Sequence, residues 1–195
     1  MELHLTGDEA ADELLTENPF ALLVGMLLDQ QIPMETAFAG PAKLRDRLGA
    51  IDPATIADHD ALAFLEAFRI PPAVHRFPGS MAARVQSLAT AVRDDWGGKA
   101  EAIWTSPGED GAAPDGPEIL RRLQALPGFG EQKAQIFLAL LGKQLGLTAS
   151  GWRKAAGAYG EEGAHRSIAD ITDAESLRLV RETKKAAKAA AKKKS

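Results

Sequence analysis

The amino-acid sequence predicts an all-α protein. Apolar residues recur at three- and four-residue spacings, Asn18-Pro19 and Asp52-Pro53 are typical of helix starts, and segments of alternating β-branched residues are missing. The chain has 195 residues, of which 45% are apolar, so it can bury a substantial core. We therefore expect about eight to ten short helices.

The first half of the chain contains five of the expected helices. The helix after Asn18-Pro19 is apolar on all sides, which predicts a central, buried position. The next begins at Pro33 and ends at Gly49, and Pro41 is expected to kink or split it. Three more are expected from Pro53, over 61–68, and over 81–92 with Ser80 as the cap.

The second half begins with a connection. Residues 96–116 are rich in Gly, Pro, Asp and Ala, which predicts a surface segment with one helical turn near 102–104. A helix from Pro117 and a partner over 131–141, ending at Gly142, follow it. Residues 148–168 are irregular, and a last helix begins at Thr172, with Glu175 completing a capping box, and fades into a lysine-rich tail over 184–195.

Composition excludes several classes of function. The chain has no cysteine, so it has no disulfide framework, thiolate zinc site, iron–sulfur cluster or cysteine nucleophile, and a reducing compartment is expected. No apolar run approaches the length of a membrane span, and the acidic N-terminus is unlike a signal peptide. These features predict a soluble, cytoplasmic protein. Without the six lysines of the tail, the 23 basic residues fall to 17 against 27 acidic ones.

The most informative segment is RRLQALPGFGEQKAQIFLALLG, residues 121–142. Pro127 ends the first helix, and Gly128 and Gly130 allow positive φ and close approach of a ligand to the backbone. Phe129 is expected to pack back between the helices. The amides from Gly128 to Gln132 have no helical partner, and such a helix N-terminus suits a phosphate. The alternative is an ordinary αα-hairpin with a glycine turn.

The whole pattern, continued by Lys133 and Ala134, resembles the helix-hairpin-helix motif of DNA-binding proteins. Two further segments, LLDQQI at 27–32 and GSMAARVQSL at 79–88, are similar to elements of enzymes that carry this motif. Together with the hairpin they resemble the helix-hairpin-helix DNA glycosylase superfamily, which includes endonuclease III and 3-methyladenine DNA glycosylase II. The resemblance covers residues 18–152. It implies two helical lobes with a cleft between them, and base excision repair by flipping a damaged base and cleaving its N-glycosidic bond.

The resemblance also implies a division of the chain and a set of contacts. Residues 18–141 would form one lobe, with the hairpin at 117–142, and residues 1–17 plus 143–183 the second. The protein would bind duplex DNA as a monomer, with no cofactor beyond a Na⁺ or K⁺ ion held by hairpin carbonyls of Leu126 and Gly128. The implied DNA contacts are Gln30, Gln31, Pro127, Gly128, Phe129, Gly130, Gln132 and Lys133. Met81 is either a second wedge between bases or a core residue.

The sequence departs from the family at its chemical groups. No acid lies between Glu131 and Glu161, and Trp152 stands where the family has its catalytic Asp. Lys133 is one residue beyond the position of the family's Schiff-base lysine, a rotation of about 100° on a helix, so it is expected not to be a nucleophile. An active enzyme would therefore be monofunctional.

Several alternatives remain open at the level of sequence. In the first, Asp29 or, as a second candidate, Glu131 replaces the missing carboxylate, although Asp29 also suits a solvated helix end. In the second, the enzyme acts on cationic alkylated bases, which are good leaving groups, and Trp152 stacks on the flipped base in a base pocket. The protein could also bind DNA or lesions without cutting, or be a helical interaction protein.

Two further expectations concern supporting residues. His75 and Arg76 are either phosphate contacts or a solvated loop pair. The C-terminal segment, which lacks the family's four cysteines, is expected to be held by apolar packing of Trp152, Tyr159, Ile168, Leu177 and Val180.

Overall fold

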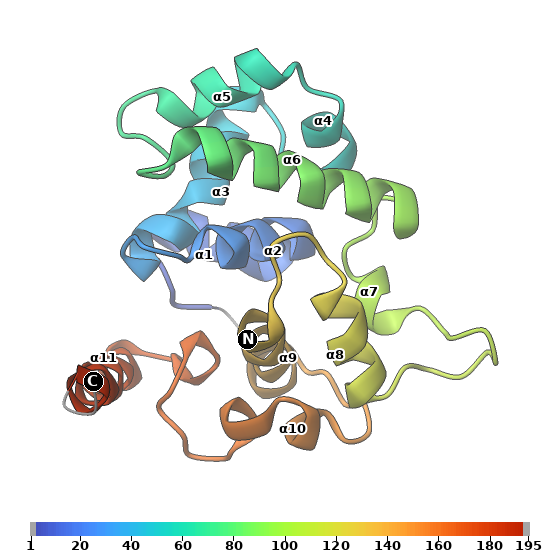
Figure 1. The fold of residues 1–195 in the computed structure, drawn as a ribbon, viewed down its shortest axis with the longest axis vertical. Coiled ribbons are helices and arrows are strands. Elements are labelled where there is room, and N and C mark those ends of the chain that lie inside the picture. The colour runs from blue at the N-terminus through green and yellow to red at the C-terminus, as the bar shows by residue number, and fades with distance from the viewer. Residues whose placement is uncertain (1–2, 193–195) are drawn as a thin grey trace.

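The computed structural model describes residues 3–192, which form helices and no strand, as the sequence predicts (Figure 1). The α-helices are α1 Glu9–Glu17, α2 Pro19–Leu28, α3 Met34–Leu48, α4 Pro53–Ala57, α5 Ala61–Arg69, α6 Pro78–Asp95, α7 Ala102–Thr105, α8 Gly116–Gln124, α9 Glu131–Gln144, α10 Trp152–Ala155 and α11 Ala174–Lys192. Two short 3₁₀-helices, η1 Gly157–Gly160 and η2 Ile168–Asp170, lie between α10 and α11. Within these residues no helix is both long and apolar enough to cross a membrane.

Helix α2 is the centre of the N-terminal half. The side chain of Asn18 caps it by accepting a hydrogen bond from the Ala21 amide, and every residue from Phe20 to Leu28 is buried. Helix α3 packs closely on it, because a Cβ added at Gly25 would lie 2.6 Å from the Phe38 ring. Helix α3 is continuous through Pro41, which is buried within it, so of the two expected outcomes, a kink or a split, the split is wrong. Burial of this face offsets the backbone hydrogen bond that proline removes.

Helix α9 is the centre of the C-terminal half, where it contacts α8, α10, η1 and η2. It does not end at Gly142 as expected, but continues to Gln144. The glycine makes room for the Trp152 ring, since a Cβ at Gly142 would lie 2.4 Å from it. Just beyond, Lys143 and Asp170 form a largely buried ion pair at 2.5 Å, which ties η2 to α9.

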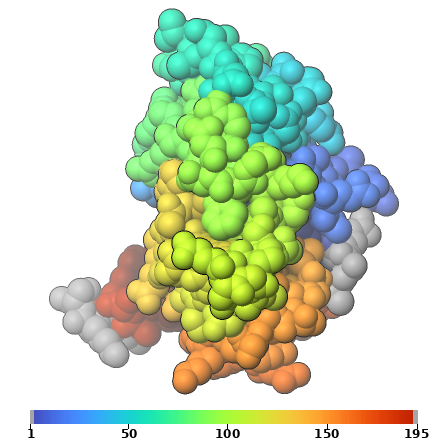
Figure 2. Space-filling model, turned by 90° about the vertical axis from the view of Figure 1, so that its right-hand side faces the viewer, coloured from blue at the N-terminus to red at the C-terminus, as the bar shows by residue number. Residues whose placement is uncertain are grey.

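The division into halves differs from the expected one. Helix α1 packs on α2 and α3, so the N-terminal residues belong with α1–α6, while the hairpin helices α8 and α9 pack with α10 and the 3₁₀-helices. Figure 1 shows α3–α6 at one end of the molecule, α1 and α2 in the middle and α8–α10 at the other end. On the face in Figure 2, the light-green segment 96–115 lies across the junction. One continuous apolar core joins the two halves.

Two helix starts and one helix end also differ from the sequence prediction. Helix α6 begins at Pro78, ahead of Ser80. The side chain of Asp173, rather than that of Thr172, accepts the Ser176 amide hydrogen at the start of α11, at 2.7 Å. Helix α11 then continues to Lys192, so most of the predicted tail 184–195 is part of a helix, and its last three residues lie outside the described residues.

Candidate functional site: a hairpin beside a charged cleft

The turn between α8 and α9 fixes the hairpin against the C-terminus of α2. Gly128 has φ of +81°, and a Cβ at this position would lie 2.2 Å from Leu27 Cδ1. Gly130 does not share this requirement, because its φ is −73° and no atom lies within 4 Å of an added Cβ. Phe129 is buried and meets the Phe137 ring edge-on, as expected for a residue packed between the helices.

The start of α9 presents backbone amides that the described chain leaves uncapped. No side chain caps the helix at Gly130, and Ala134 N–H donates to the Gly130 carbonyl at 3.0 Å in the first helical turn. The amides before Ala134 therefore remain at the positive end of the helix dipole. The Leu126 carbonyl accepts the Phe129 amide at 3.1 Å, which occupies one of its lone pairs. Binding of a monovalent cation there stays a prediction.

The loop after α2 is held from several sides at once. Its tip, Gln31, is exposed and has φ of +58°, a conformation that non-glycine residues rarely adopt. The preceding Gln30 donates its side-chain amide to Leu27 O at 2.9 Å and accepts a hydrogen bond from Arg84 at 3.1 Å. His75 Nε2 lies 3.0 Å from the Gln30 carbonyl. The surrounding structure thus fixes Gln31 in an outward position.

His75 is a structural residue, not a phosphate contact or part of a solvated pair. Its side chain is buried, and Nδ1 accepts the amide hydrogen of Phe77 at 3.1 Å. Nε2 therefore bears the proton and donates to Gln30. Burial lowers the pKa of His75, which favours this neutral form.

Lys133 points toward α2 and not out to solvent. Its ammonium group donates to three carbonyls at the end of that helix, Met26 at 2.5 Å, Leu27 at 3.0 Å and Asp29 at 3.3 Å. Burial lowers its pKa to about 8, and the nearby Asp29 carboxylate partly opposes this effect. All three hydrogens of the ammonium group therefore have acceptors, and the expectation that Lys133 is not a nucleophile stays a prediction.

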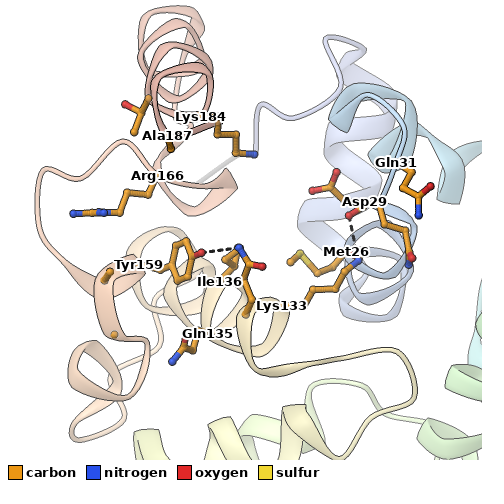
Figure 3. A pocket seen from close by; sticks show the side chains of 15 residues that line it. Met26, Asp29, Gln31, Lys133, Gln135, Ile136, Tyr159, Arg166, Lys184 and Ala187 are labelled. Atoms are coloured by element: carbon orange, nitrogen blue, oxygen red, sulfur yellow. Dashed lines mark hydrogen bonds between the residues drawn. The ribbon is translucent and has the colours of Figure 1, made fainter. Parts of the chain in front are cut away.

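A cleft of about 630 Å³ opens between the α2–α3 loop, α9, η1 and α11 (Figure 3). It brings together Asp29, Gln30, Gln31, Gln132 and Lys133, five of the residues singled out in the sequence. The remaining lining residues are Met26, Gln135, Ile136, Gly157, Ala158, Tyr159, Arg166, Thr183, Lys184 and Ala187. The α11 residues were missed, because an Ala- and Lys-rich sequence is also typical of a solvated terminus.

Asp29 is the one carboxylate among the described residues that line the cleft. Burial raises its pKa, while Lys184 and Lys133 act in the opposite direction and Glu35 adds to the increase. Figure 3 shows the Lys184 side chain extending across the cleft toward Asp29. Glu131, the second candidate acid, is exposed and is not part of the lining.

The aromatic residue of the cleft is Tyr159, and not Trp152 as expected. Trp152 is 9% exposed, with its ring against Gly142 and the Arg153 guanidinium 4.6 Å from the ring centroid. It is therefore a core residue that lies outside the cleft lining. Tyr159 is half-buried, and its hydroxyl accepts a hydrogen bond from the Gln132 side chain at 2.8 Å (Figure 3).

Met81 is a core residue, with 3% of its surface exposed, so it is not available as a wedge. Sequence reasoning missed Phe77, four residues earlier, which is 41% exposed. Its ring lies 6.0 Å from that of His75, the residue that holds the Gln30 loop, and Arg76 lies over it at 4.9 Å. Phe77 ends a loop directly before the proline that begins α6, and an aromatic residue in such a place was a usable signal for a surface contact.

A scan against protein-family models finds no match for this chain, and a search of curated proteins finds none. Among the described residues, no group of three or more His, Asp or Glu side chains is arranged to hold a metal ion.

Proposed function

We propose that this protein binds duplex DNA through the α8–α9 hairpin and receives a flipped, damaged base in the adjacent cleft, where its N-glycosidic bond is cleaved. The observation that supports the proposal best is the position of the hairpin turn. Gly128 packs against Leu27, and Lys133 of α9 donates to the carbonyls of Met26, Leu27 and Asp29. The uncapped amides at the start of α9 therefore lie beside the α2–α3 loop and the cleft, an arrangement that suits a phosphate.

Each part of this arrangement has a role in the proposal. The amides at the start of α9 bind a backbone phosphate, and Gln31 fills the gap that the flipped base leaves. Phe77 takes the place that the sequence suggested for Met81, because an exposed ring next to the Gln30 loop can stack on a neighbouring base. Lys133 is a positioning residue that joins α9 to the end of α2.

Asp29 is the proposed catalytic residue. As a carboxylate it would stabilise positive charge on the sugar and accept a proton from the attacking water. The water oxygen then forms a bond to C1′ as the bond from C1′ to the base nitrogen breaks. The base departs with the bonding electrons and takes up the proton that Asp29 received from the water, which restores the carboxylate. Lys133 and Lys184 favour the ionised carboxylate that this step requires, against the effect of burial.

A second candidate function is recognition of lesions without cleavage. It is favoured by the burial that raises the pKa of Asp29 and by the absence of a second carboxylate among the described residues that line the cleft. Such a protein would bind damaged duplexes and leave their glycosidic bonds intact.

The test combines duplex binding with excision. Fluorescence anisotropy measures affinity for undamaged and damaged duplexes, and alkali treatment reports strand breaks at excised sites. Gly130→Val is the informative variant, because the position is open and its backbone conformation accepts a side chain. It should weaken binding to every duplex, whereas Ala54→Val, an exposed change on α4, should not. Unchanged affinity in Gly130→Val would exclude the hairpin as the DNA contact, and binding without strand breaks would favour the second candidate.

A further inference from the structure

The geometry points to a selectivity for charge: we propose that Lys184 of α11, acting with Lys133, restricts the cleft to uncharged bases with carbonyl acceptors and excludes cationic N-alkylated bases. This inference rests on the function proposed above. It also assigns α11 to a wall of the cleft, where the sequence alone predicted a last helix that fades into a lysine-rich tail.

The first step is the balance of charge in the cleft. Among residues 3–192, four charged side chains line it: Asp29, Lys133, Arg166 and Lys184. Arg166 forms an ion pair with Glu161 at 3.2 Å, and Figure 3 shows its guanidinium pointing away from Asp29. The groups that remain at the centre are two ammonium groups and one carboxylate. A cationic base would therefore enter a site that already has an excess of positive charge.

The second step concerns the aromatic surface. Stacking on an electron-rich ring is the usual way to bind a cationic base. The ring suggested by the sequence for this role, that of Trp152, is buried under Gly142 and Arg153. Tyr159 is available, but its hydroxyl oxygen already accepts from Gln132, so its own hydrogen is left to donate.

The third step is the supply of hydrogen-bond donors. The lining contains the ammonium group of Lys184, the hydroxyl of Tyr159 and the side-chain amides of Gln31 and Gln135. Against these donors stand Asp29 and the amide oxygens. A base rich in carbonyl groups, such as uracil, hypoxanthine or an oxidised pyrimidine, matches this set better than an alkylated purine with a fixed positive charge.

The fourth step is the placement of Lys184 itself. Val180 anchors α11 in the core, and Arg181 forms an ion pair with Glu35 at the start of α3. These two contacts, one turn before Lys184, hold α11 in place beside the cleft. Thr183 and Ala187 of the same helix also line it, so Lys184 belongs to a wall of the site.

The experiment uses two isosteric lesions in otherwise identical duplexes. 7-Methylguanine is cationic, and 7-deaza-7-methylguanine has the same shape without the charge. Competition binding should show about tenfold tighter binding of the uncharged duplex, relative to the matched guanine duplex. An excision panel of uracil, hypoxanthine and 7-methylguanine should show product from the uncharged bases first.

Lys184→Glu is the informative variant, and Lys188→Glu is its control on the same exposed helix, because Lys188 is not part of the cleft lining. Lys184→Glu should shift the ratio of the two affinities toward 7-methylguanine by about tenfold or more. Lys188→Glu should weaken binding to both duplexes equally and leave the ratio unchanged.

The outcomes separate the inference from the function on which it rests. Preference for the cationic lesion, or a ratio that Lys184→Glu does not change, would overturn the charge selectivity while duplex binding stood. Loss of the hairpin's role, shown by Gly130→Val duplex affinity equal to wild type, would overturn both. If the protein binds duplexes but excises no base, the ratio of the affinities for the 7-methylguanine and 7-deaza-7-methylguanine duplexes still tests the charge selectivity.

Discussion

The substitution Gly128→Ala tests the packing that joins the hairpin to the cleft. An alanine at φ of +81° lies in the left-handed region, which costs about 1 to 2 kcal/mol for a residue with a Cβ. The new methyl group would also lie 2.2 Å from Leu27 Cδ1, well inside the usual contact distance. Leu27 is fully buried, so relief requires repacking at about 1 to 3 kcal/mol.

The two effects together should lower the free energy of unfolding by about 2 to 5 kcal/mol. Urea denaturation followed by circular dichroism measures this change. Gly130→Ala is the matched control, since its backbone is extended and no atom lies within 4 Å of the added Cβ. It should change stability by no more than about 0.5 kcal/mol. Equal stabilities of the two variants would refute the proposed contact between the turn and Leu27.

Four further predictions follow from other interactions. The stability of the wild type should rise between pH 8 and 10.5, and Lys133→Met should remove this rise. The pKa of Lys133 is lowered to about 8 in the folded protein, so in this pH range the unfolded wild type holds a proton that the folded protein has released. Urea denaturation of both proteins at a series of pH values measures the difference. Asp170→Ala should cost about 3 to 5 kcal/mol in thermal and urea unfolding, because Lys143 would be left buried without its partner; a cost below about 1 kcal/mol would contradict the buried ion pair. Asp29→Asn should abolish excision but keep duplex binding. In the wild type, the excision rate should fall with decreasing pH at a midpoint above pH 3.8, because burial raises the pKa of Asp29 and activity requires its ionised form. Excision by Asp29→Asn at the wild-type rate would remove Asp29 from the mechanism. Deleting residues 188–195 should reduce the slope of log K for duplex binding against log salt concentration by about 0.9 for each phosphate that these lysines neutralise. The choice of lesion should stay the same, because Lys184 is retained. An unchanged slope would show that these lysines do not bind DNA.

Local sequence signals predicted the helices well. The cap at Asn18, the all-apolar α2 and the turn before α9 depend on neighbouring residues, and each lies where the sequence placed it. The end of α9, which differed, depends on a more distant residue instead. Gly142 is a typical helix stop by its type, but here it is a space for the Trp152 ring, which the local sequence cannot reveal.

The site was predicted in part for the same reason. Asp29, Gln31 and Lys133 belong to segments whose pattern suggested DNA chemistry, and the structure brings them to one cleft. That Trp152 and Met81 are buried, whereas Tyr159 lines the cleft, could not be foreseen, because the type of a residue does not say which way it faces. Those assignments require the packing of one half of the molecule on the other.

The sequence by itself determined an all-helical protein with a glycine turn between α8 and α9, since helix periodicity, caps and glycine turns are properties of short segments. Only the tertiary structure decided that the acidic body and the lysine-rich end meet at one site. Lys184 and Asp29 are 155 positions apart in the sequence, and their mutual effect depends on the docking of α11 beside the end of α2. Electrostatic interaction acts through distance in space, which the order of residues along the chain does not fix.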